Sequence, residues 1–291
     1  MKTALNIFLL FVINLIYPQD DKINDSTIVW NENSPLSWND FKIKKNDIVK
    51  NGLQYGAGVS SSVKVDFKYN TKNNSYEYII NAVTYPYSSV SIVKYEDDYS
   101  LQHEQLHFDI VKLFAIKMEE EYKKYDNIND YRIVYDSIID ELDRTQALYD
   151  KETAHSILVF NQKIWEFKIH KALQKYGYYE EKVDANKCKG FQKGKYRYEF
   201  ENDTAFIERK DSIQYVTYKQ SGMKLKQKIK WLSDCTYLVY HTDYIFTPKY
   251  TNKFSDEKIL VKVIKIENNV YKIERISDKY NEIHLLKVIK L

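Results

Sequence analysis

Cysteine, net charge and long apolar runs are scarce in this 291-residue chain, and each scarcity excludes a class of protein. The 44 basic and 41 acidic residues leave a formal charge of +3, which gives no electrostatic case for nucleic acid as a partner. Cys188 and Cys235 are too few and too far apart to form a metal site without other ligands. Beyond the N-terminal segment, no stretch is apolar enough to span a bilayer. The length is enough for two ordinary domains.

The single long apolar run lies at the N-terminus, from Ala4 to Tyr17. One lysine precedes it and a polar break follows, which is typical of a secretory signal peptide. We predict a signal peptide at residues 1–19, with an uncleaved N-terminal anchor as the alternative. In an exported protein, Cys188 and Cys235 are expected to form a disulfide rather than remain free thiols. The sequence therefore predicts a periplasmic or extracellular protein.

The most informative motif is His103-Glu104-Gln105-Leu106-His107, an H-E-x-x-H sequence. Histidines four apart project from one face of a helix and can reach one metal ion, and the glutamate can take a proton from water held there. An apolar residue recurs every four positions, at Leu106, Ile110, Phe114 and Met118. With acidic and capping residues at 96–100, this predicts a helix that continues several turns past His107. The alternative is a helix whose histidines merely lie on its buried edge.

A catalytic zinc ion needs a third protein ligand, which the motif does not contain. No glycine follows the second histidine closely, unlike in the metzincin pattern, so the ligand should come from a later segment. The segment Tyr149–His155 interrupts two helical patterns, at about 131–148 and 156–176, and can fold back on the first helix. His155 is the preferred third ligand. Asp150 and Glu152 are the alternatives, or would orient a ligand imidazole from outside.

Two further side chains near these segments carry expectations. Tyr149 could donate a hydrogen bond to a developing oxyanion. His170 lies between lysines in the later helical pattern and is expected to face solvent. The remaining histidines, His241 and His284, lie in the strand-rich C-terminal part.

The segments LQHEQLHFDI, LYDKETAHS and NQKIW together resemble a bacterial family of predicted secreted zinc-dependent proteases. The family motifs fall here on His103–Asp109, Tyr149–His155 and Gln162–Trp165, and an opening L-S-W-x-D-F motif falls on Leu36–Phe41. The resemblance covers roughly residues 28–178. The combination is far more specific than H-E-x-x-H alone.

The resemblance implies that His103, His107 and His155 bind zinc and that Glu104 is the general base. Ser156 departs from the glycine usual at that position in the family, which would change the local turn. Farther along, Phe191–Arg197 and Trp231–Tyr237 are weakly similar to segments of small β-domains in secreted bacterial proteins.

The pattern of the chain predicts an α+β protein. Ser61–Tyr69 and Tyr76–Val83 have the alternation of a hairpin, residues 96–178 are helical, and a boundary follows near Tyr178–Lys187. Beyond it, the strand-like runs are GKYRYEF, TAFIERK, IQYVTYK, KQKIKWL, CTYLVY, KILVKVIKI, VYKIERI and HLLKVIKL. We predict a zincin-like zinc metallopeptidase domain at 20–180 and a small antiparallel β sandwich or barrel at 187–291.

The leading hypothesis is a secreted zinc metallopeptidase that acts on a peptide or protein substrate. A second is a non-catalytic zinc-binding or surface-binding protein, in which the zincin-like part is a scaffold and the β-domain docks to a partner. A third is a metal-dependent hydrolase of another amide or a glycopeptide. The intact His-Glu-His set favours an enzyme.

Overall fold

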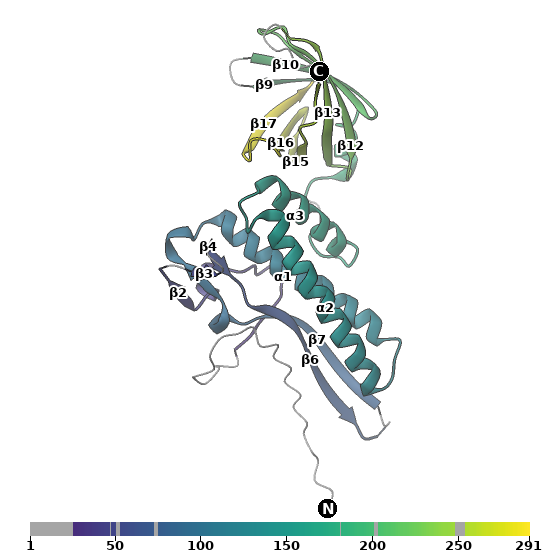
Figure 1. Cartoon of the computed structure of the whole chain (residues 1–291). Coiled ribbons are helices and arrows are strands. Elements are labelled where there is room, and N and C mark those ends of the chain that lie inside the picture. The colour runs from purple at the N-terminus through teal and green to yellow at the C-terminus, as the bar shows by residue number, and fades with distance from the viewer. Residues whose placement is uncertain are drawn as a thin grey trace, which may run out of the picture.

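The computed structural model describes residues 26–46, 48–50, 53–72, 75–180, 182–200, 203–247 and 254–291. A mixed α/β N-terminal part is followed by a C-terminal β-barrel domain (Figure 1). The predicted signal peptide at residues 1–19 lies outside the described residues. Within them, no helix is long and apolar enough to cross a membrane.

The N-terminal part is built on a long hairpin beside three helices (Figure 1). Strands β6 (Ser61–Asn70) and β7 (Ser75–Thr84) pair antiparallel from Ser61 opposite Thr84, which confirms the predicted hairpin. Strand β1 (Ile28–Val29) pairs with the outer edge of β7. The minor strands are β2 (Ile43–Lys45), β3 (Ile48–Lys50), β4 (Leu53–Tyr55), β5 (Ala57–Gly58) and β8 (Val90–Ile92). They form a three-stranded sheet, β2-β8-β5, and a β3–β4 hairpin.

The helices are α1 (Asp98–Tyr122), α2 (Ile128–Thr153) and α3 (Val159–Gln174). The Asp97 side chain caps α1 by accepting from the Ser100 amide, and the predicted long helix through the H-E-x-x-H motif is confirmed. Helix α1 packs on β6 and β7 with one face and on α2 and α3 with others. Short 3-10 turns lie at Trp38–Asp40, Pro86–Ser88 and Val93–Tyr95. The predicted second helix ended near residue 148, whereas α2 continues to Thr153.

Eight strands form a closed barrel in which each strand pairs antiparallel with the next along the chain. They are β9 (Gly194–Phe200), β10 (Asp203–Lys210), β11 (Ile213–Tyr218), β12 (Lys224–Trp231), β13 (Thr236–Phe246), β15 (Ile259–Glu267), β16 (Val270–Ser277) and β17 (Ile283–Lys290). Pairing of β17 with β9 closes the ring, and β14 (Phe254–Ser255) adds to the edge of β13. Each of the eight strand-like runs of the sequence overlaps one of these strands, and the domain is a barrel rather than a sandwich.

Side chains fill the barrel interior, including a row of polar groups across four strands. The buried Arg209 guanidinium donates to Gln214, Gln214 donates to Gln227, and Gln227 donates to Thr242. Arg209 also donates to the Phe191 carbonyl and the Tyr237 hydroxyl, and its charge lies over both of those aromatic rings. These bonds satisfy a buried cation that would otherwise be costly.

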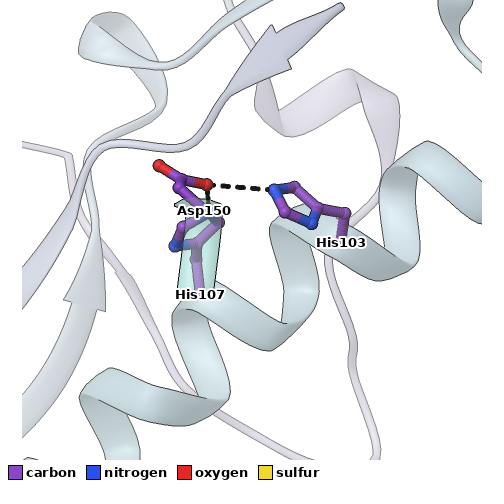
Figure 2. A group of neighbouring side chains, drawn as sticks. All are labelled: His103, His107 and Asp150. Atoms are coloured by element: carbon purple, nitrogen blue, oxygen red, sulfur yellow. Dashed lines mark hydrogen bonds and ion pairs between the residues drawn. The ribbon is translucent and has the colours of Figure 1, made fainter. Parts of the chain in front are cut away.

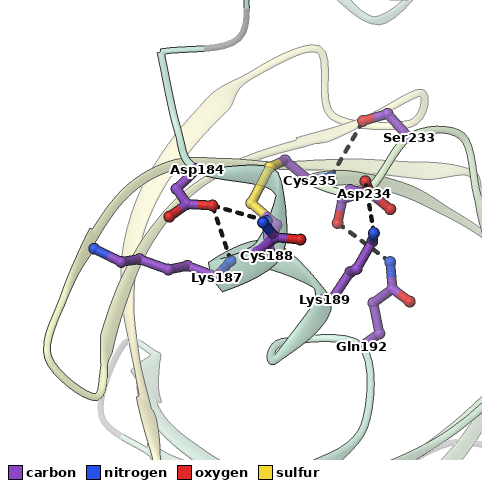
Figure 3. The surroundings of a disulfide bond; sticks show 9 residues. Asp184, Lys187, Cys188, Lys189, Gln192, Ser233, Asp234 and Cys235 are labelled. Carbon is purple, nitrogen blue, oxygen red and sulfur yellow. Dashed lines mark hydrogen bonds and ion pairs between the residues drawn. A yellow bond between two sulfur atoms is a disulfide. The ribbon is translucent and has the colours of Figure 1, made fainter.

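The short helix α4 (Ala185–Lys189) is tied to the barrel by the Cys188–Cys235 disulfide (Figure 3). Both cysteines are buried, and their Cα atoms are 5.0 Å apart, within the usual range for a disulfide. The bond joins the entry of the domain to the start of β13. The predicted pairing is confirmed.

Helix α3 connects the two parts of the molecule. Phe160 on α3 packs with Leu260 and Ile276 of the barrel, and Ile164 and Leu238 extend this apolar contact. At the other end of the helix, the Lys171 ammonium donates to the Leu232 carbonyl. The helix therefore packs on α1 and α2 on one side and on the barrel on the other.

Candidate metal centre

Three side chains from α1 and α2 place possible metal ligands beside one another. His103 and His107 lie one turn apart on α1, and Asp150 faces them from the last turn of α2 (Figure 2). Asp150 Oδ1 is 3.2 Å from His103 Nε2 and 3.0 Å from His107 Nε2. All three ligand atoms lie within 4.8 Å of one another. Ligands bound tetrahedrally at about 2.0–2.1 Å are roughly 3.3 Å apart, so this set fits one ion with small adjustments.

Two glutamines fix which nitrogen of each imidazole faces Asp150. The Gln162 side-chain oxygen is 3.2 Å from His103 Nδ1, and the Gln146 oxygen accepts from His107 Nδ1. An amide oxygen accepts only from a protonated Nδ1, so Nε2 is the nitrogen that each ring would offer to an ion. Without an ion, a proton on Nε2 donates to Asp150. Gln146 also donates to the His107 carbonyl over 3.0 Å, which fixes the orientation of its amide. Metal-ligating histidines commonly have such a hydrogen bond at the nitrogen that does not face the ion.

The charges of the cluster support one another. Burial alone would raise the pKa of the Asp150 carboxyl, but the hydrogen bonds and charges of His103 and His107 outweigh it and lower that pKa. Burial alone would lower the pKa of His107, but the hydrogen bond to Asp150 and the charges of Asp150 and Glu104 raise it. Asp150 is therefore held as a carboxylate, the form that binds metal ions.

His155, the preferred third ligand, lies just outside this set. Its Nδ1 is 3.3 Å from the same Asp150 oxygen, and 36% of its side chain is exposed. Among the described residues, the group of ligand atoms within 4.8 Å of one another comprises Asp150 and the two α1 histidines, without His155. The structure thus brings the alternative ligand, Asp150, into the centre and places His155 beside Asp150.

Glu104, the expected general base, is buried on α1 between the two histidines. Its Oε2 accepts a 2.7 Å hydrogen bond from the Val59 amide, in the segment between β5 and β6. This bond anchors one carboxylate oxygen to the backbone of the strand region.

The role of Tyr149 as an oxyanion donor stays a prediction; its side chain is fully buried, and its ring lies against both histidines. Its ring stacks on His103 with 4.6 Å between ring centroids, and its hydroxyl donates to the His103 carbonyl over 3.3 Å. Burial and the charge of Glu104 raise the pKa of Tyr149. The hydroxyl therefore supports the backbone of the helix that carries the candidate ligands.

Glu152, the other alternative ligand, lies outside the centre. Its carboxylate accepts a 2.7 Å hydrogen bond from the Trp165 indole on α3. Trp165 in turn packs against Tyr149, with 5.5 Å between ring centroids. Glu152 thus helps to hold α2 against α3.

The expectation for His170 needs correction, because it is part of a buried network that sequence reasoning did not find. Its Nε2 is 3.0 Å from Asp109, and its ring stacks on Tyr179. Asp109 is 1% exposed and accepts further hydrogen bonds of 2.8 Å each from Trp30, Gln105 and Tyr179. The network holds α1 to three other segments, two residues beyond His107. The aspartate of the HFD motif was a sequence signal for it.

The comparisons with known proteins add no relative. No protein-family model, curated protein or solved structure matches the chain.

Proposed function

We propose that the protein is a zinc-dependent hydrolase of peptide bonds, in which His103, His107 and Asp150 hold the ion. The observation that carries the proposal is the convergence of two Nε2 atoms and one carboxylate oxygen, with both Nδ1 atoms already bonded to glutamine oxygens. Two imidazoles and one carboxylate, with a position left for water, form a donor set of catalytic zinc sites. In this proposal, the N-terminal part is a zincin-like domain.

The chain supplies the base and the scaffold for the reaction. A bound zinc ion would polarise the scissile carbonyl and lower the pKa of the attacking water. Glu104 takes a proton from that water as its oxygen adds to the carbonyl carbon, and it returns the proton to the amine nitrogen as the carbon–nitrogen bond breaks. The Val59 amide steadies the carboxylate during both transfers. Asp150 stays ionised and holds the ligand position.

The site is proposed to work outside the cytoplasm, in the periplasm or the extracellular space. The buried Cys188–Cys235 disulfide supports this location, because such bonds persist in oxidising compartments. We propose a peptide substrate because the H-E-x-x-H segment resembles that of predicted zinc-dependent proteases. Another amide is the alternative substrate.

The test of the proposal is the pair Glu104→Gln and His103→Ala. We expect the purified wild-type protein to hold about one zinc ion per chain and to cleave an unstructured protein such as casein. Glu104→Gln should keep the zinc and lose at least about 100-fold in hydrolysis, because the proton acceptor is gone. His103→Ala should lose the zinc.

Elemental analysis and a fluorescent peptide assay provide the two measurements. Hydrolysis at the wild-type rate in Glu104→Gln would remove Glu104 from the mechanism. A wild-type protein that binds no zinc would overturn the proposal and favour a binding protein. Zinc without cleavage of any peptide, but with release of another amine, would identify a different amide as substrate.

A further inference from the structure

The loop between α2 and α3 has a backbone conformation that side chains normally avoid. Ala154, His155 and Ser156 have φ angles of 48°, 51° and 73°, three consecutive non-glycine residues in the left-handed region. Each such residue costs roughly 1 kcal/mol or more, so contacts must hold the loop in place. A glycine at position 156, as in the resembling family, would relieve part of this cost.

Part of the loop is held from the N-terminal domain. The His155 amide donates to the Asp150 carbonyl over 2.9 Å, and the Leu158 amide donates to the Thr153 carbonyl over 2.8 Å. The Tyr99 hydroxyl on α1 donates to the Ser156 carbonyl over 2.6 Å. These bonds fix the start of the loop.

The end of the loop is held by the barrel. Asn281, in the turn between β16 and β17, donates through Nδ2 to the Ile157 carbonyl over 2.7 Å. Its Oδ1 accepts from the Val159 amide over 2.6 Å. One amide side chain thus bonds the backbone on both sides of Leu158. Ile157 and Val159 are separated from Asn281 by 124 and 122 positions in the chain.

The loop and the barrel turn are joined here mainly by hydrogen bonds, because the apolar side chains around the contact are largely exposed. Ile157 is 69% exposed and Leu158 is 42% exposed. Tyr280, next to Asn281, is 59% exposed. The buried contact of Phe160 with Leu260 and Ile276 begins only after the loop, and it brings the barrel turn within reach.

We propose that Asn281 is a positioning residue for the metal centre. It holds the loop so that His155 stays beside Asp150. The barrel therefore helps to position a residue of the candidate site. His155 Nδ1 is 3.3 Å from Asp150 Oδ1, so a displaced loop would remove one of the three imidazoles that hold this oxygen, the others being His103 and His107. The link to metal binding rests on the proposed function, whereas the link to the loop does not.

The test compares Asn281→Gly with Asn268→Gly in the full chain. Asn281 and Asn268 both have a φ of 54°, in the turns before β17 and β16, and glycine tolerates that conformation. The substitution therefore removes the amide and keeps the turn. Asn268 is exposed and lies in the β15–β16 turn, so it is the matched control.

Hydrogen exchange of the metal-free proteins reports on the loop. We expect the amides of residues 155–159 to exchange at least about 10-fold faster in Asn281→Gly, with barrel amides unchanged, because Val159 loses its acceptor. Asn268→Gly should match wild type. Equal exchange at 155–159 in both variants would overturn the proposal.

Cobalt titration then reports on the metal centre. We expect Asn281→Gly to bind Co²⁺ about 10-fold more weakly and with an altered visible spectrum, as for the loss of an outer hydrogen bond of a ligand. An unchanged affinity and spectrum would overturn the role in the metal centre. If wild type binds no metal while exchange still rises in Asn281→Gly, the proposed function fails and the loop contact stands.

Discussion

Gln146 and Gln162 set the orientation of the two imidazoles in the candidate site, at the level of single residues. Each places an amide oxygen on an Nδ1 atom, so each imidazole presents its Nε2 to the same point. A histidine on a buried helix edge, without a ligand, would not need this arrangement twice. The two glutamines are therefore the strongest argument that the H-E-x-x-H helix is built for a metal ion.

Substitution of Asp150, His155 and Glu152 tests which of them is the third metal ligand. We expect Asp150→Ala to weaken zinc binding by more than the roughly 100-fold that losing an outer hydrogen bond can cause, because a ligand is lost. His155→Ala should weaken it only about 10-fold, since His155 then acts through Asp150. Glu152→Ala, the carboxylate control, should keep the wild-type affinity because its partner is Trp165.

Competition with a chromophoric chelator measures these three affinities. Loss of zinc from His155→Ala as complete as from His103→Ala would restore the three-histidine site that the family resemblance implies. Retention of zinc by Asp150→Ala would point to the same conclusion.

The sequence predicted the two α1 histidines and Glu104 but ranked Asp150 second, because the apolar pattern of α2 fades near Leu148. The helix continues to Thr153 and ends with Ala154 in the left-handed region. With that extra turn, Gln146 and Asp150 are four residues apart and face α1 together. The four-residue spacing of Gln146 and Asp150 indicated that they share a helix face. The sequence did not show that α2 extends far enough to include Asp150.

At the scale of elements, α3 has two partners, and its charged pair lies between them. Lys163 and Glu166 are 2.8 Å apart, with side chains 12% and 24% exposed. Burial alone would raise the pKa of Glu166, but the charge and hydrogen bond of Lys163 lower it below 4.5. The charges of Glu166 and Glu274 keep the pKa of Lys163 above its usual 10.5, despite burial.

A pH dependence of stability follows from this pair. The contribution of ionised Glu166 to the free energy of unfolding is fully present above its unfolded pKa of 4.5. It is lost as the pH falls through the lower pKa of the folded state. We expect Glu166→Gln to lower the free energy of unfolding by about 2 kcal/mol at pH 7. The difference from wild type should shrink toward pH 3. Urea unfolding of the metal-free proteins at both pH values measures it.

The matched control for that experiment is Glu121→Gln on α1. Glu121 pairs with Lys124 at 2.7 Å, but both side chains are at least one-third exposed. Such an exposed pair is screened by solvent and contributes little to stability. Equal effects of the two substitutions at pH 7 would show that the α3 pair is no stronger than a surface pair.

The elements themselves were largely predictable, because alternation and helical spacing are local properties. All eight barrel strands and the β6–β7 hairpin follow from period-two patterns. The closure of β17 on β9 and the network around Asp109 were not predictable from the sequence. The closure joins the first and last strands of the barrel, and the network joins Asp109 to Trp30 and Tyr179, so both depend on partners that are distant in the chain.

At the scale of the whole molecule, the disulfide and the metal centre lie in different parts. We expect the double variant Cys188→Ala, Cys235→Ala to lose about 4 kcal/mol of barrel stability, since the bond closes a loop with a separation of 47 residues. Zinc content should not change, because the ligands lie on α1 and α2. Denaturant unfolding followed by tryptophan fluorescence, with parallel metal analysis, checks both. Loss of zinc with the disulfide would show that barrel stability controls the centre.

The pairing of β17 with β9 that closes the barrel affects the order in which the protein folds. Strand β9 must wait for β17, the last strand to be made, so the ring closes late and over a large separation in the chain. The turn with Asn281 immediately precedes that last strand. The N-terminal domain can form its helices and bring its histidines together while the barrel is still open. The two hydrogen bonds of Asn281 with the loop beside Asp150 can form only at the final step, so a chain interrupted during synthesis would lack them.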